Sequence, residues 1–300
     1  MIPPGDKKRL VVITGASGAV GREYLHLFCS QPNVSCVAIA RRDIQNLPAG
    51  VILLKLDLLD KEAVVSSLEQ IPLSDIDEIV LIHSVGKFKF EPEGNPEIDT
   101  DGDGIDDEVY KTNIETFLNI LRSLLPRIED QHREGRVLSL ALCGLGSISD
   151  KYQVAYWSSY TKAKNVLRSI IYNLVQEKPE SVRGLFVNVS TVDTENENEL
   201  RPFADKTYWL KAKEIANASL PFVLGEESGS WKQVDVFKES PLFREGYYED
   251  LAEIRRQWMA QQEGGEKGSV TQNAELHSEV KVNITDSIQD LFEGGQFKRR

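Results

Sequence analysis

Two side chains in the stretch YWSSYTKAK, residues 156–164, have types and a spacing that could move a proton. Tyr160 and Lys164 lie four positions apart, so on a helix their side chains would stack on one face. A phenol held beside an ammonium group is suited to donating a proton to a reacting oxygen. The same pair would also fit the solvated face of a helix, and the surrounding sequence has to distinguish these interpretations.

The phase of the neighbouring apolar residues indicates which of two lysines faces inward. Positions three, six and ten after Lys164 form an apolar stripe suited to packing on a sheet: Leu167, Ile170 and Leu174. The same offsets from Lys162 would bury polar groups: Asn165, Arg168 and Tyr172. We therefore expect Lys164, and with it Tyr160, to face the interior of the fold.

The elements that must position this pair alternate between short apolar runs and longer helical patterns. The expected strands are Arg9–Thr14, Val34–Ile39, Val51–Leu56, Glu78–His83, Arg136–Leu142, Val182–Val189 and Gln233–Val236. Helices are expected near 19–30, 60–70, 106–131, 155–177 and 208–223, with a further amphipathic helix over 247–262. This alternation predicts an α/β fold, a doubly wound parallel sheet of Rossmann type covered by helices on both faces.

Composition limits the classes of function. The chain has 300 residues, of which 41% are hydrophobic and 27% charged, as expected for one globular α/β domain over residues 1–262. A net charge of −12 argues against nucleic acid and against anionic membrane surfaces as partners. Three scattered cysteines fit neither a disulfide framework nor a zinc site. With no signal peptide or membrane-spanning stretch in the sequence, a cytoplasmic location is the expectation.

Residues 263–300 differ in composition from the preceding domain. The stretch after Gln262 is polar and contains several glycines, which predicts a linker or a disordered tail. Within it, TDSIQDLFEGG could instead form one short helix capped by Thr285 or Asp286.

The stretch RLVVITGASGAVGREYLHLF, residues 9–28, is the most specific in the chain. A strand ends at Thr14, a glycine-rich turn follows, and an amphipathic helix begins near Ala19. Gly15 permits the tight turn, and Gly21 permits close packing of the helix. The small residues between them, Ser17 and Gly18, let the backbone approach a pyrophosphate at the helix N-terminus.

The segment Thr14–Gly21 resembles the nucleotide-binding signature of the short-chain dehydrogenase/reductase superfamily, and the resemblance extends from about residue 9 to residue 236. After the second strand, where a carboxylate would accept the ribose hydroxyl of NAD, stand Arg41 and Arg42. A guanidinium can bind a 2′-phosphate, so NADP(H) is the expected cofactor; a solvated arginine pair is the alternative. The resemblance adds three further cofactor contacts: Asp57, Leu58 and Gly86.

The resemblance also implies the roles of the catalytic residues. Tyr160 would donate a proton to a carbonyl while the dinucleotide delivers hydride, and Lys164 would hold the ribose and lower the tyrosine pKa. If Lys162 were the family lysine, Ser158 would occupy the tyrosine position. Asn113 would bend its helix and hold a relay water, and Thr194 would hold the nicotinamide carboxamide. The position of the carbonyl-orienting serine is divergent, with Ser147 and Cys143 as candidates.

Two functions remain open at this level. The first is an NADP(H)-dependent oxidoreductase that acts on a small carbonyl or alcohol, in a homo-oligomer as the resemblance implies. The second is a dinucleotide-binding sensor or scaffold that kept the fold and lost the chemistry. His83 and Ser84, which replace two asparagines of the family pattern, favour the second. We expect His83 to be a hydrogen-bonded strand-end residue without a catalytic role.

An acidic loop, EIDTDGDGIDDEVY, precedes the helix of Asn113. Its carboxylates occupy positions 1, 3, 5 and 9 of a calcium-loop pattern: Asp99, Asp101, Asp103 and Asp107. Position 12 is Tyr110 rather than the bidentate glutamate, so a calcium site would be incomplete. The alternative is an exposed acidic turn that leads into the N-terminus of a helix.

Overall fold

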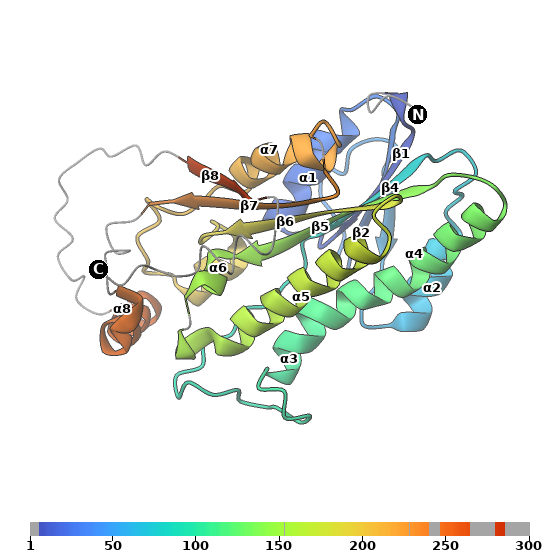
Figure 1. The fold of residues 1–300 in the computed structure, drawn as a ribbon. Helices are drawn as coiled ribbons and strands as arrows, with labels where there is room; N and C mark the ends of the chain where they lie inside the picture. The colour runs from blue at the N-terminus through green and yellow to red at the C-terminus, as the bar shows by residue number, and fades with distance from the viewer. Residues whose placement is uncertain (1–5, 153, 228, 240–246, 265–279, 286–300) are drawn as a thin grey trace.

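A computed structural model of the chain describes residues 6–152, 154–227, 229–239, 247–264 and 280–285. Within these residues one sheet of eight strands has the order β3-β2-β1-β4-β5-β6-β7-β8 (Figure 1). The strands are β1 Arg9–Thr14, β2 Val34–Ala40, β3 Ile52–Lys55, β4 Glu78–His83, β5 Ser139–Ser147, β6 Val182–Val189, β7 Trp231–Lys238 and β8 Val280–Thr285. Strands β1 to β7 pair in parallel, as the sequence predicts for a Rossmann fold.

Helices cover both faces of this sheet. They are α1 Ala19–Cys29, α2 Lys61–Glu69, α3 Asp107–Tyr110, η2 Lys111–Glu115, α4 Thr116–Arg133, η3 Ile148–Lys151, η4 Ala155–Trp157, α5 Ser158–Glu177, α6 Glu195–Leu200, α7 Ala212–Val223, η5 Tyr247–Glu249 and α8 Leu251–Glu263. Figure 1 shows α2, α4 and α5 on one face and α1 and α7 on the other. Side chains of β1 alternate between these two faces. Leu10 and Val12 belong to the core under α4 and α5. Val11 and Ile13 belong to the core under α1 and α7.

The order of the strands fixes where a ligand can bind. From β1 the chain builds outward through β2 and β3, then returns to place β4 on the other side of β1. In such sheets the crevice outside the carboxyl ends of the strands, at the point where the order reverses, is the usual binding site. The glycine-rich turn after β1 and the residues after β4 meet at this point.

Strand β5 lies further along the chain than the predicted Arg136–Leu142. It begins at Ser139 and continues through two glycines to Ser147. A Cβ atom on Gly144 would lie 2.6 Å from Cδ1 of Ile171 in α5, and one on Gly146 would lie 2.2 Å from Oδ1 of Asn188. These glycines therefore let α5 and β6 pack closely against the strand, which continues through both of them to Ser147.

The eighth strand corrects the prediction for residues 263–300. Val280–Thr285 runs antiparallel to β7 and covers its edge, although the sequence placed this stretch in a polar linker or tail. The short helix predicted over 285–295 lies outside the described residues except for Thr285, which belongs to β8.

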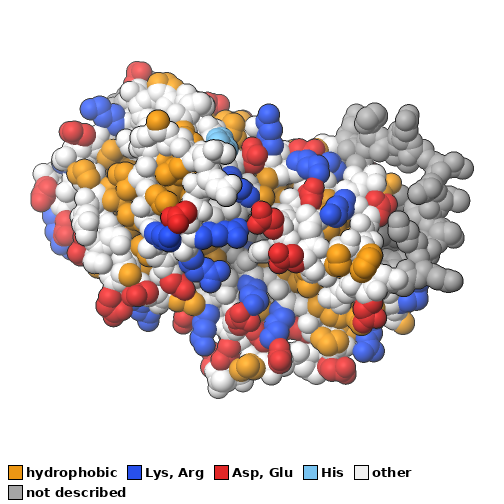
Figure 2. All heavy atoms as spheres, turned by 180° about the vertical axis from the view of Figure 1, so that it is seen from behind, with side chains coloured by type: hydrophobic (Ala, Val, Ile, Leu, Met, Phe, Trp, Pro, Cys, Tyr) orange, Lys and Arg blue, Asp and Glu red, His pale blue; other side chains and the backbone are white. Residues whose placement is uncertain are grey.

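Figure 2 shows basic and acidic side chains side by side on the face seen from behind. Among the described residues, no helix has the length and apolar composition needed to cross a membrane.

Candidate active site

The turn between β1 and α1 has the geometry of a phosphate-binding loop. Gly15 has a positive φ of 65°, and the N–H of Gly18 donates to its carbonyl oxygen at 2.9 Å. A Cβ atom on Gly21 would lie 2.4 Å from the Gly15 oxygen, so only glycine lets α1 approach the turn this closely. Ser17 and Ala19 are half-buried beside it. The turn thus leads closely into the N-terminus of α1, whose free N–H groups and dipole suit the negative charge of a pyrophosphate.

The arginines predicted to read a 2′-phosphate are exposed after β2. Arg42 donates to the carboxylate of Glu195 in α6 at 3.1 Å, and Arg41 is also exposed. The carboxylate of Asp57 is exposed after β3 and accepts from the main-chain N–H of Leu59 at 3.0 Å. Leu58 differs from the expectation, because its side chain is buried in the core under α4. We therefore assign the Leu58 side chain to packing rather than to cofactor contact.

Lys164 and Asn113 meet beside Gly86, at the end of β4. A Cβ atom on Gly86 would lie 2.9 Å from Nζ of Lys164 and 3.0 Å from Oδ1 of Asn113, so a larger residue would occupy the space between them. Lys164 is 3% exposed, and no hydrogen-bond or ion-pair partner for its ammonium lies among the described residues. Burial lowers its pKa to about 7. Oδ1 of Asn113 is also buried and has no hydrogen-bond partner in the described ranges of the chain.

The helix around Asn113 widens into a single π-turn, η2. Nδ2 of Asn113 donates to the carbonyl of Val109 at 2.8 Å and to that of Lys87 at 2.9 Å. The Val109 carbonyl is the acceptor that residue 113 would use through its main chain in a regular α-helix. The side chain takes this acceptor, and such turns are frequent at functional sites. The distortion expected at Asn113 is therefore present.

Tyr160 lies next to Lys164, whose ammonium is 5.4 Å from the centre of the phenol ring. Its ring packs edge-on against Phe88, with the ring centres 5.2 Å apart. Burial raises the pKa of Tyr160, and the carboxylate of Glu197 in α6 raises it further. This differs from the expectation that Lys164 would lower that pKa. The structure buries Lys164 and exposes Lys162, in agreement with the phase argument.

The two candidates for the carbonyl-orienting group lie in different environments. Cys143 is 1% exposed in the core under α1, and burial raises its pKa to about 12. It belongs to the apolar packing around Tyr24 and cannot face a substrate, so we withdraw it as a candidate. Ser147 is half-buried at the end of β5, where its Oγ accepts from the N–H of Ser149 at 3.2 Å. Ser147 remains the candidate.

Both ring nitrogens of His83 have hydrogen-bond partners in the structure. Its Nδ1 lies 2.9 Å from Oγ1 of Thr14, and its Nε2 lies 3.4 Å from Oγ1 of Thr116. Burial, followed by the nearby charge of Lys164, lowers its pKa to about 3. A neutral, hydrogen-bonded histidine of this kind confirms the expectation of a structural residue.

A sequence model of the short chain dehydrogenase family matches residues 9–205, about two thirds of the chain. The chain belongs to the short-chain dehydrogenase family. A comparison with curated protein sequences finds no match to this chain.

Several solved structures of the family share its fold. A short chain dehydrogenase from Burkholderia cenocepacia J2315, in complex with NADP, has a TM-score of 0.60 at 16% identity over 85% of this chain and 98% of that one. A ligand-free aldohexose dehydrogenase from Thermoplasma acidophilum also has a TM-score of 0.60, at 16% identity over 76% and 93%. A 3-ketoacyl-(acyl-carrier-protein) reductase from Brucella melitensis, complexed with NADH, has a TM-score of 0.58 at 16% identity over 76% and 97%.

The chain has an aromatic cluster beside Tyr160 that the sequence did not identify. Phe88 and Phe90 follow β4, Trp157 precedes α5, and Trp258 comes from α8. Phe90 and Trp258 stack with ring centres 5.0 Å apart. The cluster joins elements far apart in the chain, and α8 lies beyond the matched family segment. The only sequence signal was the four-residue spacing of Ile254 and Trp258 on the amphipathic terminal helix.

Residues 194–201, which comprise α6 and its two capping residues, are called the lid segment here. Arg201, at the end of this segment, ties it to α8. Its guanidinium lies 4.5 Å from the centre of the Trp258 ring and 5.1 Å from that of Trp209. It also donates to Gln261 of α8 at 3.0 Å. Thr194, expected to hold a carboxamide, caps α6 by accepting from the N–H of Glu197 at 3.2 Å. The lid therefore has defined contacts at both of its ends.

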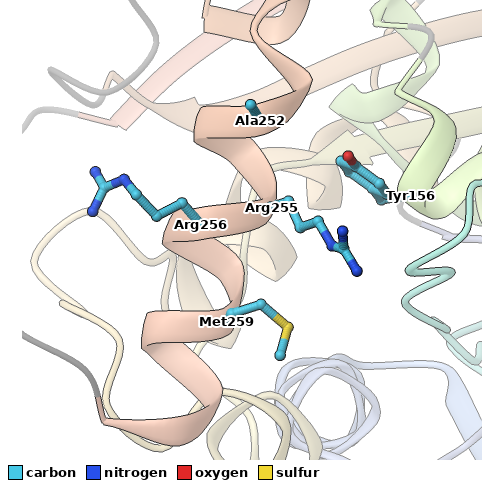
Figure 3. Close-up of a pocket in the computed structure, with 5 residues that line it drawn as sticks. All are labelled: Tyr156, Ala252, Arg255, Arg256 and Met259. Atoms are coloured by element: carbon cyan, nitrogen blue, oxygen red, sulfur yellow. The ribbon is translucent and has the colours of Figure 1, made fainter.

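A groove of about 520 Å³ lies on the outer side of this cluster, between α8 and Tyr156. Ala252, Arg255, Arg256 and Met259 supply its wall on α8. In Figure 3 the side chains of Arg255 and Met259 extend toward the side on which Tyr156 lies, whereas Arg256 points the other way. Tyr156 belongs to η4, directly before the helix that carries Tyr160, and Tyr160 itself is not among the residues that line the groove.

The acidic loop brings three of its four predicted ligands together. The carboxylate oxygens of Asp99, Asp101 and Asp103 lie within 4.8 Å of one another. Asp107 differs from the expectation, because its carboxylate accepts from the N–H and Oγ1 of Thr100 at 2.9 and 2.8 Å and closes the loop instead. The calcium site stays a prediction.

The same loop rests on the helix that carries the candidate proton donor. Nζ of Lys162 in α5 donates to the carbonyl of Gly104 at 2.8 Å, and the N–H of Asp106 donates to Oγ of Ser159 at 2.9 Å. The loop therefore supports the first turn of α5.

Proposed function

We propose that this protein is an NADP(H)-dependent oxidoreductase that transfers hydride between the nicotinamide and a small carbonyl or alcohol compound. The observation that carries the proposal is the ammonium of Lys164 beside Oδ1 of Asn113, at the space that Gly86 leaves open. Neither group has a hydrogen-bond partner within the part of the chain that the structure describes. Buried polar groups without partners are costly unless a ligand satisfies them. The hydroxyls of a ribose and an ordered water would satisfy both groups.

The chain's own residues fit the dinucleotide at each of its parts. The glycine turn accommodates the pyrophosphate. Arg41 and Arg42 bind the 2′-phosphate, and Asp57 contacts the adenine. Lys164 binds the nicotinamide ribose, and Thr194 holds the carboxamide. When bound, the cofactor supplies the hydride.

Tyr160 acts on the oxygen of the substrate. In the direction of reduction, its neutral hydroxyl donates a proton to the carbonyl oxygen while the carbonyl carbon is reduced to the alcohol. The phenol is protonated at neutral pH, as donation to a carbonyl oxygen requires, and burial raises its pKa above the ordinary value. Ser147 orients the carbonyl by hydrogen bonding, and Asn113 holds the water that returns a proton to Tyr160.

A binding protein without turnover is the second candidate, and the aromatic cluster favours it. The ring of Tyr160 packs against Phe88, which in turn packs against Trp258 at 5.2 Å between ring centres. Oγ of Ser147 is already engaged as a helix cap. A sensor that binds the dinucleotide would keep Lys164 and the glycine turn but would not depend on the Tyr160 hydroxyl.

Replacing that hydroxyl separates the two functions. We expect Tyr160→Phe to reduce NADPH oxidation with a panel of small aldehydes and ketones by about 10²- to 10⁴-fold, the usual contribution of a general acid. The dissociation constant for NADPH, measured by fluorescence titration, should change little. Tyr156→Phe, one turn away in the same aromatic surroundings, is the matched control and should retain turnover. Equal rates for Tyr160→Phe and the unaltered protein would contradict the enzymatic proposal.

A further inference from the structure

Glu195, the first residue of the lid helix α6, reaches across to the other side of the cofactor crevice. One of its carboxylate oxygens lies 3.1 Å from Nη2 of Arg42, after β2, and the other lies 3.8 Å from Nη2 of Arg22 in α1. These arginines belong to two separate elements, the end of the second strand and the helix that follows the glycine turn. A single lid carboxylate therefore connects both.

This contact differs from the other acidic contacts of the lid. Glu197 pairs within the same segment with Arg201, four positions on, as is usual on a helix surface. Glu195 instead pairs with a residue 153 positions away in the chain. A carboxylate in the first turn also favours the helix dipole, but that effect requires no arginine on another element.

The guanidinium that Glu195 contacts is the group proposed to bind the 2′-phosphate of NADP(H). The carboxylate carries one negative charge, and a phosphate monoester carries nearly two together with three acceptor oxygens. Both ligands prefer the same fork of N–H donors on an arginine. The side chains of Arg22, Arg42 and Glu195 are 41%, 67% and 65% exposed, so their pairing is weak enough for a ligand to exchange.

We propose that Glu195 is a specificity-determining residue: its carboxylate occupies Arg42 until the 2′-phosphate of the cofactor displaces it and releases α6. This inference rests on the proposed NADP(H) function. Thr194, expected to hold the nicotinamide carboxamide, directly precedes Glu195 and caps the same helix. NADH, which lacks the 2′-phosphate, leaves the Glu195 contact in place.

The test compares Glu195→Gln with Glu199→Gln, a charge change one turn further along the same lid helix. Dissociation constants for adenosine 2′,5′-bisphosphate, NADPH and NADH are measured by fluorescence titration at low salt. We expect Glu195→Gln to bind the first two ligands about two- to five-fold more tightly, the range expected for loss of a competing exposed ion pair. Its affinity for NADH and all three affinities of Glu199→Gln should remain unchanged. In about 0.5 M salt the difference should disappear.

Hydrogen exchange provides a second measurement on the free protein. Amides of α6 should exchange faster in Glu195→Gln than in the unaltered protein. Adenosine 2′,5′-bisphosphate should accelerate their exchange in the unaltered protein, and adenosine 5′-monophosphate should not.

The outcomes distinguish this inference from the function on which it rests. If the unaltered protein binds NADH as tightly as NADPH, the NADP(H) preference fails and the inference fails with it. If the preference for NADPH is present but Glu195→Gln leaves both affinities unchanged, only the role of Glu195 is refuted. Equal tightening for NADH and NADPH also refutes it, because the lid would then obstruct dinucleotides in general.

Discussion

Replacing Lys164 with methionine should stabilise the free protein while it removes the group that binds the ribose. The ammonium is buried, and its pKa falls from an ordinary 10.5 to about 7. That difference corresponds to about 5 kcal/mol, since one pKa unit is about 1.4 kcal/mol. The figure is an upper bound on the gain in unfolding free energy of Lys164→Met, because methionine has a similar volume and no charge to desolvate.

The sign of the pH dependence follows from proton binding. Between about pH 7 and pH 10.5 the lysine is protonated in the unfolded chain and largely neutral in the native protein. The unfolded state therefore binds more protons, and the contribution of Lys164 to the unfolding free energy rises with pH across this window. Below pH 7 both states are protonated, and the native protein carries the full cost of the buried ammonium. The advantage of Lys164→Met should thus be largest at pH 6 and should shrink toward pH 10.

Urea unfolding followed by tryptophan fluorescence at pH 6, 8 and 9.5 measures this difference. Lys162→Met, on the exposed side of the same helix, is the control and should show no comparable trend over that range. A stability difference between Lys164→Met and the unaltered protein that does not change with pH would refute the reasoning. So would a loss of stability at pH 6, which would mean that the ammonium has a stabilising partner in the native protein.

Two further predictions concern residues that the sequence left open. Ser147→Ala should lower turnover about 10²- to 10³-fold through loss of one hydrogen bond to the reacting carbonyl. Cys143→Ala should leave steady-state turnover unchanged and lower the unfolding midpoint by removing a buried side chain. The opposite pattern would reverse the assignment. For the acidic loop, micromolar to millimolar calcium should raise the melting temperature, and Asp101→Asn should abolish that rise. A melting temperature that does not respond to calcium or to a chelator would exclude the calcium site.

The parts of the fold that sequence predicts well are those with one dominant physical signal. Strands β1, β4 and β6 occupy their predicted positions because each is built around a short apolar run buried on both faces. In α5, Lys164 and Leu167 face the sheet as predicted, and the fully buried stripe continues through Ile171 and Val175. The predicted Ile170 and Leu174 pack against the same core but are only partly buried. The spacing of apolar residues predicts which face of a helix is buried. Packing against the neighbouring strands then decides which residues of its last turns are fully buried.

The parts that sequence missed depend on contacts between distant elements. A composition rich in polar residues and glycine gave no indication of β8, which forms only because β7 offers it an edge. The pKa of Tyr160 depends on the depth of its burial and on Glu197, neither of which spacing reveals. The choice between Ser147 and Cys143 depended on which of them lies inside the core, so structure was needed to make it.

Strand β8 also determines how the chain can be shortened for laboratory work. A version that ends at residue 262, where the polar composition begins, would appear to keep the whole dehydrogenase domain. It would remove β8 and leave the main-chain N–H and C=O groups along the outer side of β7 open to pairing with another molecule. Aggregation of such a shortened protein would then report an uncovered strand edge rather than a defect in the catalytic region. A useful C-terminal boundary therefore lies beyond Thr285.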